Sequence, residues 1–214
     1  MATTFTYQLS ACVLITPQYV PRIVTAEEVV NASGGIRHTQ AVDTPEVEVA
    51  IYGTLQVLNA KQSPPQQGNL SVNQPGNESL ARMEKVALAA FRLALNEQPA
   101  AAMGINFVAT IAFPQRTANA LLFELLNPRI AKQSASGKGT LRTAGLKLIY
   151  DYQPWVATVS IEADPSNEKQ LVCNVNFNVN TPTKGDISLI RQASKLRTWF
   201  EQTVREIIGK DSNV

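Results

Sequence analysis

Residues 171–180 read L-V-C-N-V-N-F-N-V-N, and this stretch decides how the last third of the chain folds. Asparagine occupies every second position from Asn174 to Asn180. The residues between them are apolar: Val175, Phe177 and Val179. Because side chains alternate between the two faces of a β-strand, the pattern predicts a strand with an apolar face towards helices and an amide face away from them. Asparagine is depleted in strands, so strand propensity alone does not explain the amide face.

Two earlier segments alternate in the same way. From Phe5 to Ile15 the odd positions are apolar, which predicts one continuous strand. Its even positions begin with Thr6, Gln8 and Ser10. Residues 46–58 also predict one strand, in which Gly53 suggests a bulge or a close backbone approach. The even positions of that strand carry Glu46, Glu48, Tyr52, Thr54 and Gln56. We interpret the two glutamates as solvated charges that protect a sheet edge.

The rest of the chain supplies further strands and helices. Residues 102–114 predict a central strand that is buried on both sides. Short connections join three strands into a meander at 141–152, 154–163 and 170–180. Apolar periodicity and capping signals predict helices at about 25–34, 80–98, 117–126 and 186–208.

These elements predict an α+β fold with a single, largely antiparallel sheet of six to seven strands. About four helices are expected to pack mainly on one face of the sheet. Residues 60–79 contain three prolines and two glycines and predict a long mobile or disordered loop. No internal repeat is visible in the sequence. We expect one domain over residues 1–214.

Composition limits the function classes. Only 17% of the residues are charged, against about 25% in a typical globular domain. The formal net charge of +2 argues against a dominant phosphate-binding surface and hence against nucleic acid as a partner. We see no secretory signal and no apolar run long enough to span a membrane, so the expected location is the cytoplasm and no membrane partner is expected.

No catalytic, metal-binding or cofactor-binding motif emerges from the sequence. His38 is the only histidine, and no G-x-S-x-G elbow accompanies it. Residues 136–140 read S-G-K-G-T but lack the spacing of a phosphate-binding loop. Cys12 and Cys173 fall inside strand-like runs, which is typical of packed thiols. We therefore expect no cofactor, and the sequence favours a protein that is not an enzyme.

Basic residues offer only weak contacts for an anion. Arg82, Lys85 and Arg92 fall on one face of the predicted helix at 80–98. Lys138 lies in a glycine-rich segment. Three helix contacts without an aromatic platform would give weak, salt-sensitive binding. A solvated helix face is the simpler interpretation.

The positive signal is a polar sheet face without charge. Interface cores are depleted in charge but keep hydrogen-bonding groups, so this face suits a protein contact. Its candidate residues are Thr6, Gln8, Ser10, Tyr52, Thr54, Gln56, Asn174, Asn176 and Asn178. The first hypothesis is a non-enzymatic structural or interaction protein that self-associates, with a dimer favoured, or binds another protein through this face. The alternative is a small-ligand binding module or an enzyme with a polar pocket near Tyr52, lined by Asn, Gln and Tyr side chains.

Overall fold

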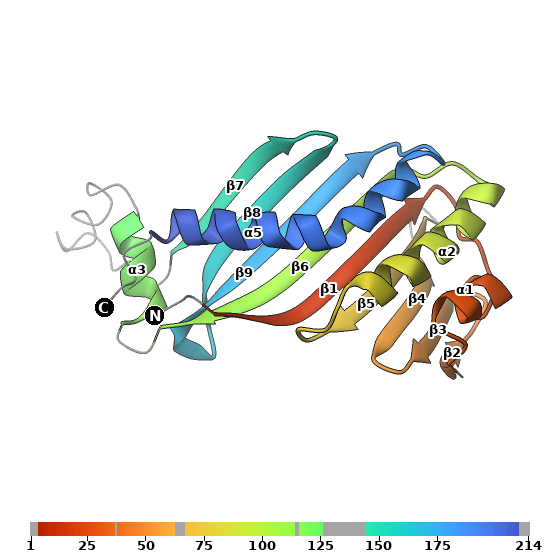
Figure 1. The fold of residues 1–214 in the computed structure, drawn as a ribbon, viewed down its shortest axis with the longest axis horizontal. Coiled ribbons are helices and arrows are strands. Elements are labelled where there is room, and N and C mark those ends of the chain that lie inside the picture. The colour runs from red at the N-terminus through yellow and green to blue at the C-terminus, as the bar shows by residue number, and fades with distance from the viewer. Residues whose placement is uncertain (1–3, 37, 63–66, 114–115, 126–143, 210–214) are drawn as a thin grey trace.

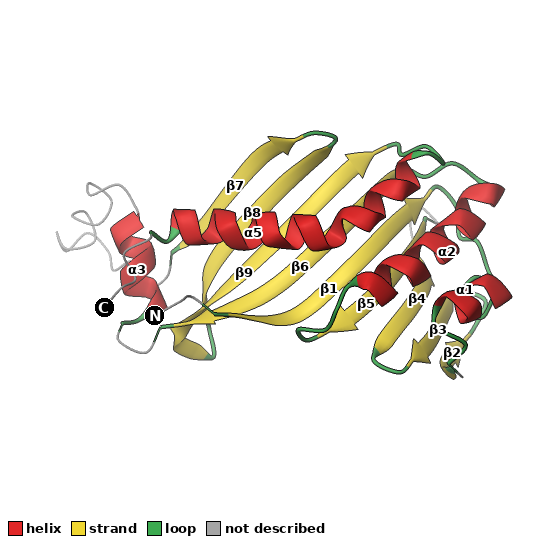
Figure 2. Ribbon diagram, viewed as in Figure 1, coloured by secondary structure: helices red, strands yellow, loops and turns green. Residues whose placement is uncertain are grey.

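The described part of the chain forms a single antiparallel sheet of nine strands with helices on one face (Figures 1 and 2). The computed structural model describes residues 4–36, 38–62, 67–113, 116–125 and 144–209. The strand order is β2-β3-β4-β5-β1-β6-β9-β8-β7. The strands are β1 (Phe5–Thr16), β2 (Thr39–Asp43), β3 (Val47–Tyr52), β4 (Leu55–Lys61), β5 (Gly68–Pro75), β6 (Ala102–Ala112), β7 (Gly145–Tyr152), β8 (Trp155–Asp164) and β9 (Asn167–Asn180).

Helices α1, α2 and α5 cover the same side of the sheet, which we call the covered face (Figure 2). The helical elements are α1 (Glu27–Ala32), α2 (Ala81–Glu97), α3 (Ala118–Leu125), the 3-10 helix η1 (Asp186–Gln192) and α5 (Ala193–Ile207). In the described part of the chain, no helix packs on the middle of the opposite side, which we call the open face. No helix in that part is both long and apolar enough to cross a membrane.

The sequence predicted the α+β class and the antiparallel sheet correctly, but the expected six to seven strands were wrong. One cause lies at Gly53. The segment expected as one strand at 46–58 is a hairpin, in which β3 pairs with β4 and Tyr52 lies opposite Leu55. Gly53 has a φ of +65°, a conformation that two-residue hairpin turns require and that glycine adopts without strain.

The predicted loop at 60–79 also contains a strand. Within it, β5 pairs with β1 on one side and β4 on the other. Leu70 and Val72 are its buried large apolar side chains. Two hydrogen-bonded neighbours therefore override a composition that is poor in strand formers. Residues 63–66 lie outside the described part, and β2 at the sheet edge was not predicted.

A bulge in β1 changes which residues face the helices. The register against β6 shifts between Tyr7 and Leu9, so Gln8 is an extra residue. Phe5 and Tyr7 are buried on the covered face before the bulge. After it the even positions take over that face, and the fully buried ones are Ser10, Cys12 and Leu14.

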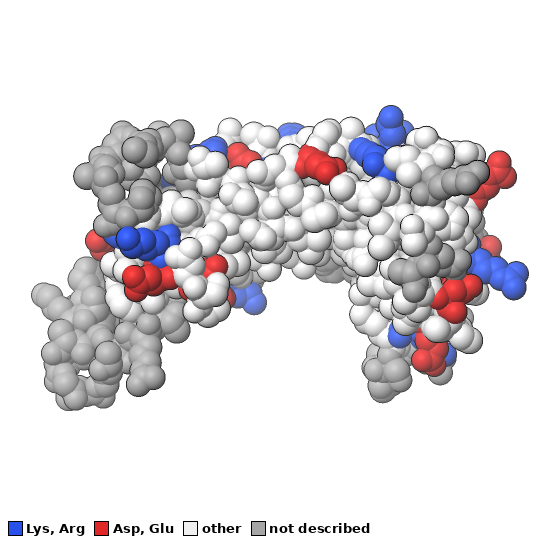
Figure 3. Space-filling model, turned by 90° about the horizontal axis from the view of Figure 1, so that it is seen from below, with Lys and Arg blue, Asp and Glu red and all other residues white. Residues whose placement is uncertain are grey.

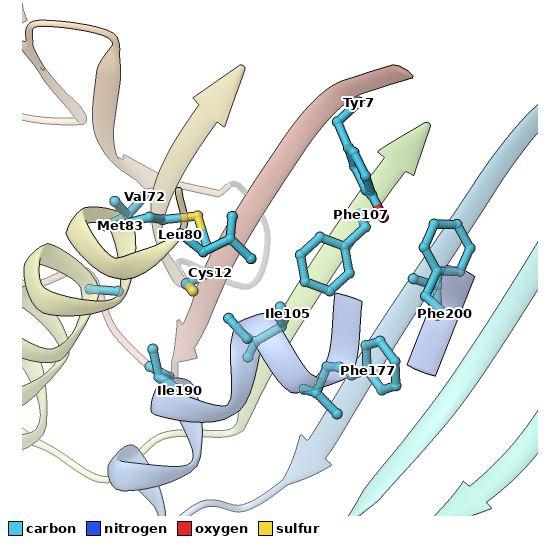
Figure 4. Packing of buried hydrophobic residues seen from close by; sticks show 14 of the residues in the cluster. Tyr7, Cys12, Val72, Leu80, Met83, Ile105, Phe107, Phe177, Ile190 and Phe200 are labelled. Carbon is cyan, nitrogen blue, oxygen red and sulfur yellow. The ribbon is translucent and has the colours of Figure 1, made fainter. Parts of the chain in front are cut away.

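The core lies between the sheet and α2, η1 and α5 (Figure 4). Phe107 of the central strand β6 is fully buried. Its ring centroid lies 6.2 Å from Tyr7, 6.3 Å from Phe177 and 6.4 Å from Phe200. Edge-to-face and stacked ring pairs of this kind add to the burial of apolar area and fix how α5 crosses the sheet.

The two halves of the chain repeat one topology. Each half contributes a central strand (β1 or β6), a helix (α1 or α3), a meander (β2–β5 or β7–β9) and a long helix (α2 or α5). β1 and β6 pair antiparallel at the centre of the sheet, so an approximate two-fold axis passes between them. The repeat concerns the order of the elements only, since no repeat is visible in the sequence itself.

Glu84 of α2 provides a pH-dependent link between α2 and α5. Its Oε1 accepts a hydrogen bond from the Ser194 backbone N–H at 3.3 Å. Burial raises the pKa of the Glu84 carboxyl, while the Ser194 hydrogen bonds and the Arg191 charge oppose that rise. A raised pKa favours the protonated form in the folded state. The stability it contributes is therefore present below the ordinary pKa and is lost as the pH rises through the folded pKa.

We expect Glu84→Gln to be slightly more stable than the wild type at pH 7 and equal to it at pH 4. Glutamine keeps an acceptor oxygen for Ser194 and has no charge to desolvate. The expected rise in melting temperature at pH 7 is about 1 °C, because the site is partly solvated. Thermal melts at the two pH values measure it. A variant that is less stable at pH 7 would contradict the prediction.

Candidate functional site on the open face

The asparagine ladder lies on the open face, as predicted. Val175 and Phe177 of β9 are fully buried against the covered side. Asn174 and Asn176 are exposed, and Asn178 is partly exposed. Asn178 Nδ2 donates a hydrogen bond to Asn180 Oδ1 at 2.7 Å, so neighbouring amides on this face partner one another.

The strand registers extend the ladder across the sheet. Gln56, Asn73, Ala11, Asn106, Asn176 and Thr158 lie in one transverse row, each directly opposite the next. We call these six residues the amide row. Asn73 Nδ2 donates to Gln56 Oε1 at 3.2 Å. The Oδ1 of Asn106, at the centre, is buried and has no hydrogen-bond partner within the described chain. A buried acceptor without a partner is costly in the free chain.

The open face is free of charge at its centre. The three central strands, β5, β1 and β6, contain no Lys, Arg, Asp or Glu, and neither does β9 over 170–180. Apolar side chains flank the amide row, Leu58 and Val13 on one side and Leu9 and Val108 on the other. This mixture of apolar groups and amides without charge is typical of the buried core of a protein–protein interface.

The molecule is hollowed beneath the sheet. Figure 3 views it from below, with the helix side at the top, and shows a lower surface that is recessed between its two ends and almost free of charged side chains there. Charges of both signs gather at the two ends. Four large hydrophobic side chains that are 36% to 68% exposed lie on the outer strands of the open face: Val42, Ile51, Ile149 and Val156. The open face is therefore concave and uncharged at its centre, with exposed apolar side chains towards its edges.

The structure separates the predicted interface residues into two groups. Thr6, Gln56 and the three asparagines lie on the open face, with Gln8 exposed at the bulge. Thr54 lies in the β3–β4 turn, where its hydroxyl donates to Glu78 at 2.8 Å. Ser10 and Tyr52 were placed wrongly, because both side chains are fully buried on the covered face. Ser10 follows the bulge in β1, and Tyr52 belongs to β3, whose even positions face the helices.

Two amide side chains of the row, Asn73 and Asn106, were not indicated by the sequence. Asn73 was missed because it lies inside the predicted loop. Asn106 was missed because its strand was expected to be buried on both faces. Its period-two alternation with Ile105 and Phe107 was the signal that would have placed it beside the asparagines of β9.

Three of the four predicted anion contacts lie on α2 in the described part of the chain. The Arg82 guanidinium donates to the Tyr52 backbone carbonyl and closes the β3–β4 hairpin onto α2. Lys85 and Arg92 are exposed on α2. Lys138 lies outside the described residues. The Arg82 contact is structural, and the residues that the structure describes form no basic patch on the open face.

Groups that carry out catalysis are scarce in the described chain. Burial raises the pKa of the Cys173 thiol to about 12 and that of the Cys12 thiol further, so both are protonated at neutral pH. No group of three or more His, Cys, Asp or Glu side chains in the described residues is placed to hold a metal ion. The His38 ring lies 5.3 Å from the Tyr52 ring.

A cavity of about 490 Å³ lies apart from the open face, between residues 18–26 and the end of α2. Gln18, Tyr19, Leu93, Glu97 and Gln98 are among its lining residues. The predicted pocket near Tyr52 and the asparagines does not form, because Tyr52 and the asparagines lie on opposite faces of the sheet.

No model of a known protein family matches the sequence, and no curated protein matches it either. The function is therefore inferred from the geometry of the open face.

Proposed function

We propose that the chain is a non-enzymatic interaction protein that holds a protein partner in the concave open face of its sheet. The observation that carries this proposal is the charge-free amide row at the centre of the open face, flanked by the apolar side chains of Leu58, Val13, Leu9 and Val108. An ordinary solvated sheet face carries more Lys and Glu.

Shape and charge define the partner. Two hollow faces touch only at their rims, so a second copy packed face to face would leave the amide row uncovered. A convex surface, such as a helix or a rounded loop, reaches the row. It must carry little charge, because a charged group buried against the row would find no opposite charge in β5, β1 or β6. The partner is therefore a protein with a convex surface rich in amide, hydroxyl and apolar groups.

Photo-crosslinking from the open face tests the proposal. A benzophenone amino acid at position 158, next to Asn176 in the amide row, is expected to form a covalent adduct of one defined mass in the native cells. The same probe at position 85 on α2 is the control for surface collisions. The captured protein is then purified, and its affinity for the unmodified chain is measured by calorimetry.

Introducing a charge gives the matching loss of function. Asn176→Lys, in the chain that carries the probe at 158, is expected to reduce both the adduct and the affinity by more than tenfold, which corresponds to about 1.4 kcal/mol. Asn176 is exposed, so the melting temperature should change little. Equal adducts from positions 85 and 158, or adducts that survive Asn176→Lys, would overturn the proposal.

The cavity beside α2 supports a second, separate candidate function, the binding of a small molecule. Its wall combines the polar groups of Gln18, Tyr19 and Gln98 with the apolar side chain of Leu93. A thermal-shift screen of small polar metabolites tests this, with Leu93→Trp as the variant that fills the cavity. A ligand whose shift persists in Leu93→Trp does not bind there.

A further inference from the structure

The two edges of the sheet differ in a way that bears on self-association. At one edge, β2 has five residues and a register shift between Gln40 and Val42, features that discourage further strand pairing. At the other edge, β7 has eight residues and pairs with β8 without any shift. No strand of the described residues pairs with the outer edge of β7. This edge therefore presents backbone groups to a further strand.

The side chains of β7 would complement those of a second β7 strand that runs antiparallel to it. On the open face, Lys147, Ile149 and Asp151 follow one another at every second position. Ile149 is 68% exposed, the highest value among the large hydrophobic side chains that the structure describes. On the covered face, Leu148 precedes Ile149 and Tyr150 follows it.

We propose that two copies of the chain join through their β7 edges as antiparallel neighbours, with a two-fold axis at Ile149. This register places Ile149 against the partner subunit's Ile149. It places Lys147 opposite the partner subunit's Asp151, and Asp151 opposite the partner subunit's Lys147. Opposite charges and apolar pairs directly across two strands stabilise a sheet.

Other registers lose this complementarity. Because one face of the sheet is buried, a register must shift by two residues to keep each side chain on its own face. A shift in one direction places Lys147 opposite Ile149, and a shift in the other places Ile149 opposite Asp151. The ion pairs are lost in both cases, so the charges select a single register.

The dimer would extend the open face. Thr158, at the end of the amide row, lies directly opposite Ile149. Through the two Ile149 residues, the amide row of one copy continues into that of the other. Self-association at this edge does not depend on what the open face binds, so the two proposals fail or succeed separately.

Cysteine crosslinking tests the register. Ile149→Cys places two thiols on the axis, where paired Cα atoms are about 4.5–5.5 Å apart, within the range of a disulfide. Mild oxidation is expected to convert most of the protein to a species of twice 23.3 kDa. Lys147→Cys is the matched control, because its two copies lie four residues apart along the strands, about 13 Å. Cys12 and Cys173 are buried and give little background.

Charge exchange tests the pairing in the absence of any covalent bond. Light scattering at low salt should show a dimer, and Lys147→Glu or Asp151→Lys alone should weaken it by about tenfold, because each creates two like-charge pairs. The double variant Lys147→Glu/Asp151→Lys restores both pairs and should dimerise like the wild type. A monomeric wild type, equal crosslinking at positions 147 and 149, or a double variant weaker than both single variants would each overturn the proposal.

Discussion

Phe107→Ala is expected to lower the free energy of unfolding by about 4 kcal/mol, because it removes a fully buried ring and leaves a cavity. The rings of Tyr7, Phe177 and Phe200 surround Phe107 and belong to three different elements, β1, β9 and α5. The lost contacts therefore weaken the junction between the two halves of the sheet and the helix above them. Urea denaturation followed by far-UV circular dichroism measures the change.

The adjacent residue provides a matched control. Val108 lies on the same strand but on the open face, where it is partly exposed. Val108→Ala is expected to cost less than about 1 kcal/mol. Phe107→Leu, which keeps most of the apolar volume, should cost about 1–2 kcal/mol and remains measurable if the alanine variant does not fold. Equal losses for Phe107→Ala and Val108→Ala would mean that the two faces of β6 are equally buried.

The orientation of β9 could be predicted because nothing interrupts its alternation. From Leu171 to Phe177 every second residue is fully buried in the structure. The pattern needs only the period of two, which an unbroken strand imposes on its side chains. The uncharged character at the centre of the open face could also be predicted, since β1 and residues 170–180 of β9 contribute only uncharged side chains whichever way they are turned.

The predicted alternation of faces was wrong where a bulge or a turn interrupts the strand. The bulge at Gln8 and the turn at Gly53 each exchange the two faces for the residues that follow. A one-residue slip moves every later side chain to the other face. Ser10 follows the bulge and Tyr52 precedes the turn, so an alternation continued through either feature assigned both side chains to the wrong face. Neither a bulge nor a two-residue turn leaves a mark in the hydrophobic pattern strong enough to place it.

Strands of low propensity could not be predicted at all. β5 owes its conformation to β1 and β4 on either side rather than to its own residues. Because β5 was not predicted, its Asn73 side chain was left out of the predicted interface. The transverse row itself is a property of registers between strands far apart in the sequence, so no local pattern reveals it.

Glu48→Ala is expected to lower the free energy of unfolding by about 3 kcal/mol, because it leaves buried donors without an acceptor. The Glu48 side chain is 5% exposed. Its carboxylate accepts hydrogen bonds from the backbone N–H groups of Arg22 and Ile23 and, at 3.0 Å, from Asn59 Nδ2. Arg22 has a φ of +62°, which is strained for a residue with a side chain, so the carboxylate holds an unfavourable backbone in place.

Glu46 provides the control, because the sequence placed Glu46 and Glu48 together on one solvated face. That interpretation was wrong for Glu48, since β3 turns its even positions to the covered face. Glu46 is exposed, and Glu46→Ala should change the stability by less than about 0.5 kcal/mol. Hydrogen exchange should show lost protection at the amides of Arg22 and Ile23 in Glu48→Ala only. If both variants unfold at the same urea concentration, the Glu48 carboxylate does not anchor the segment that leads into α1.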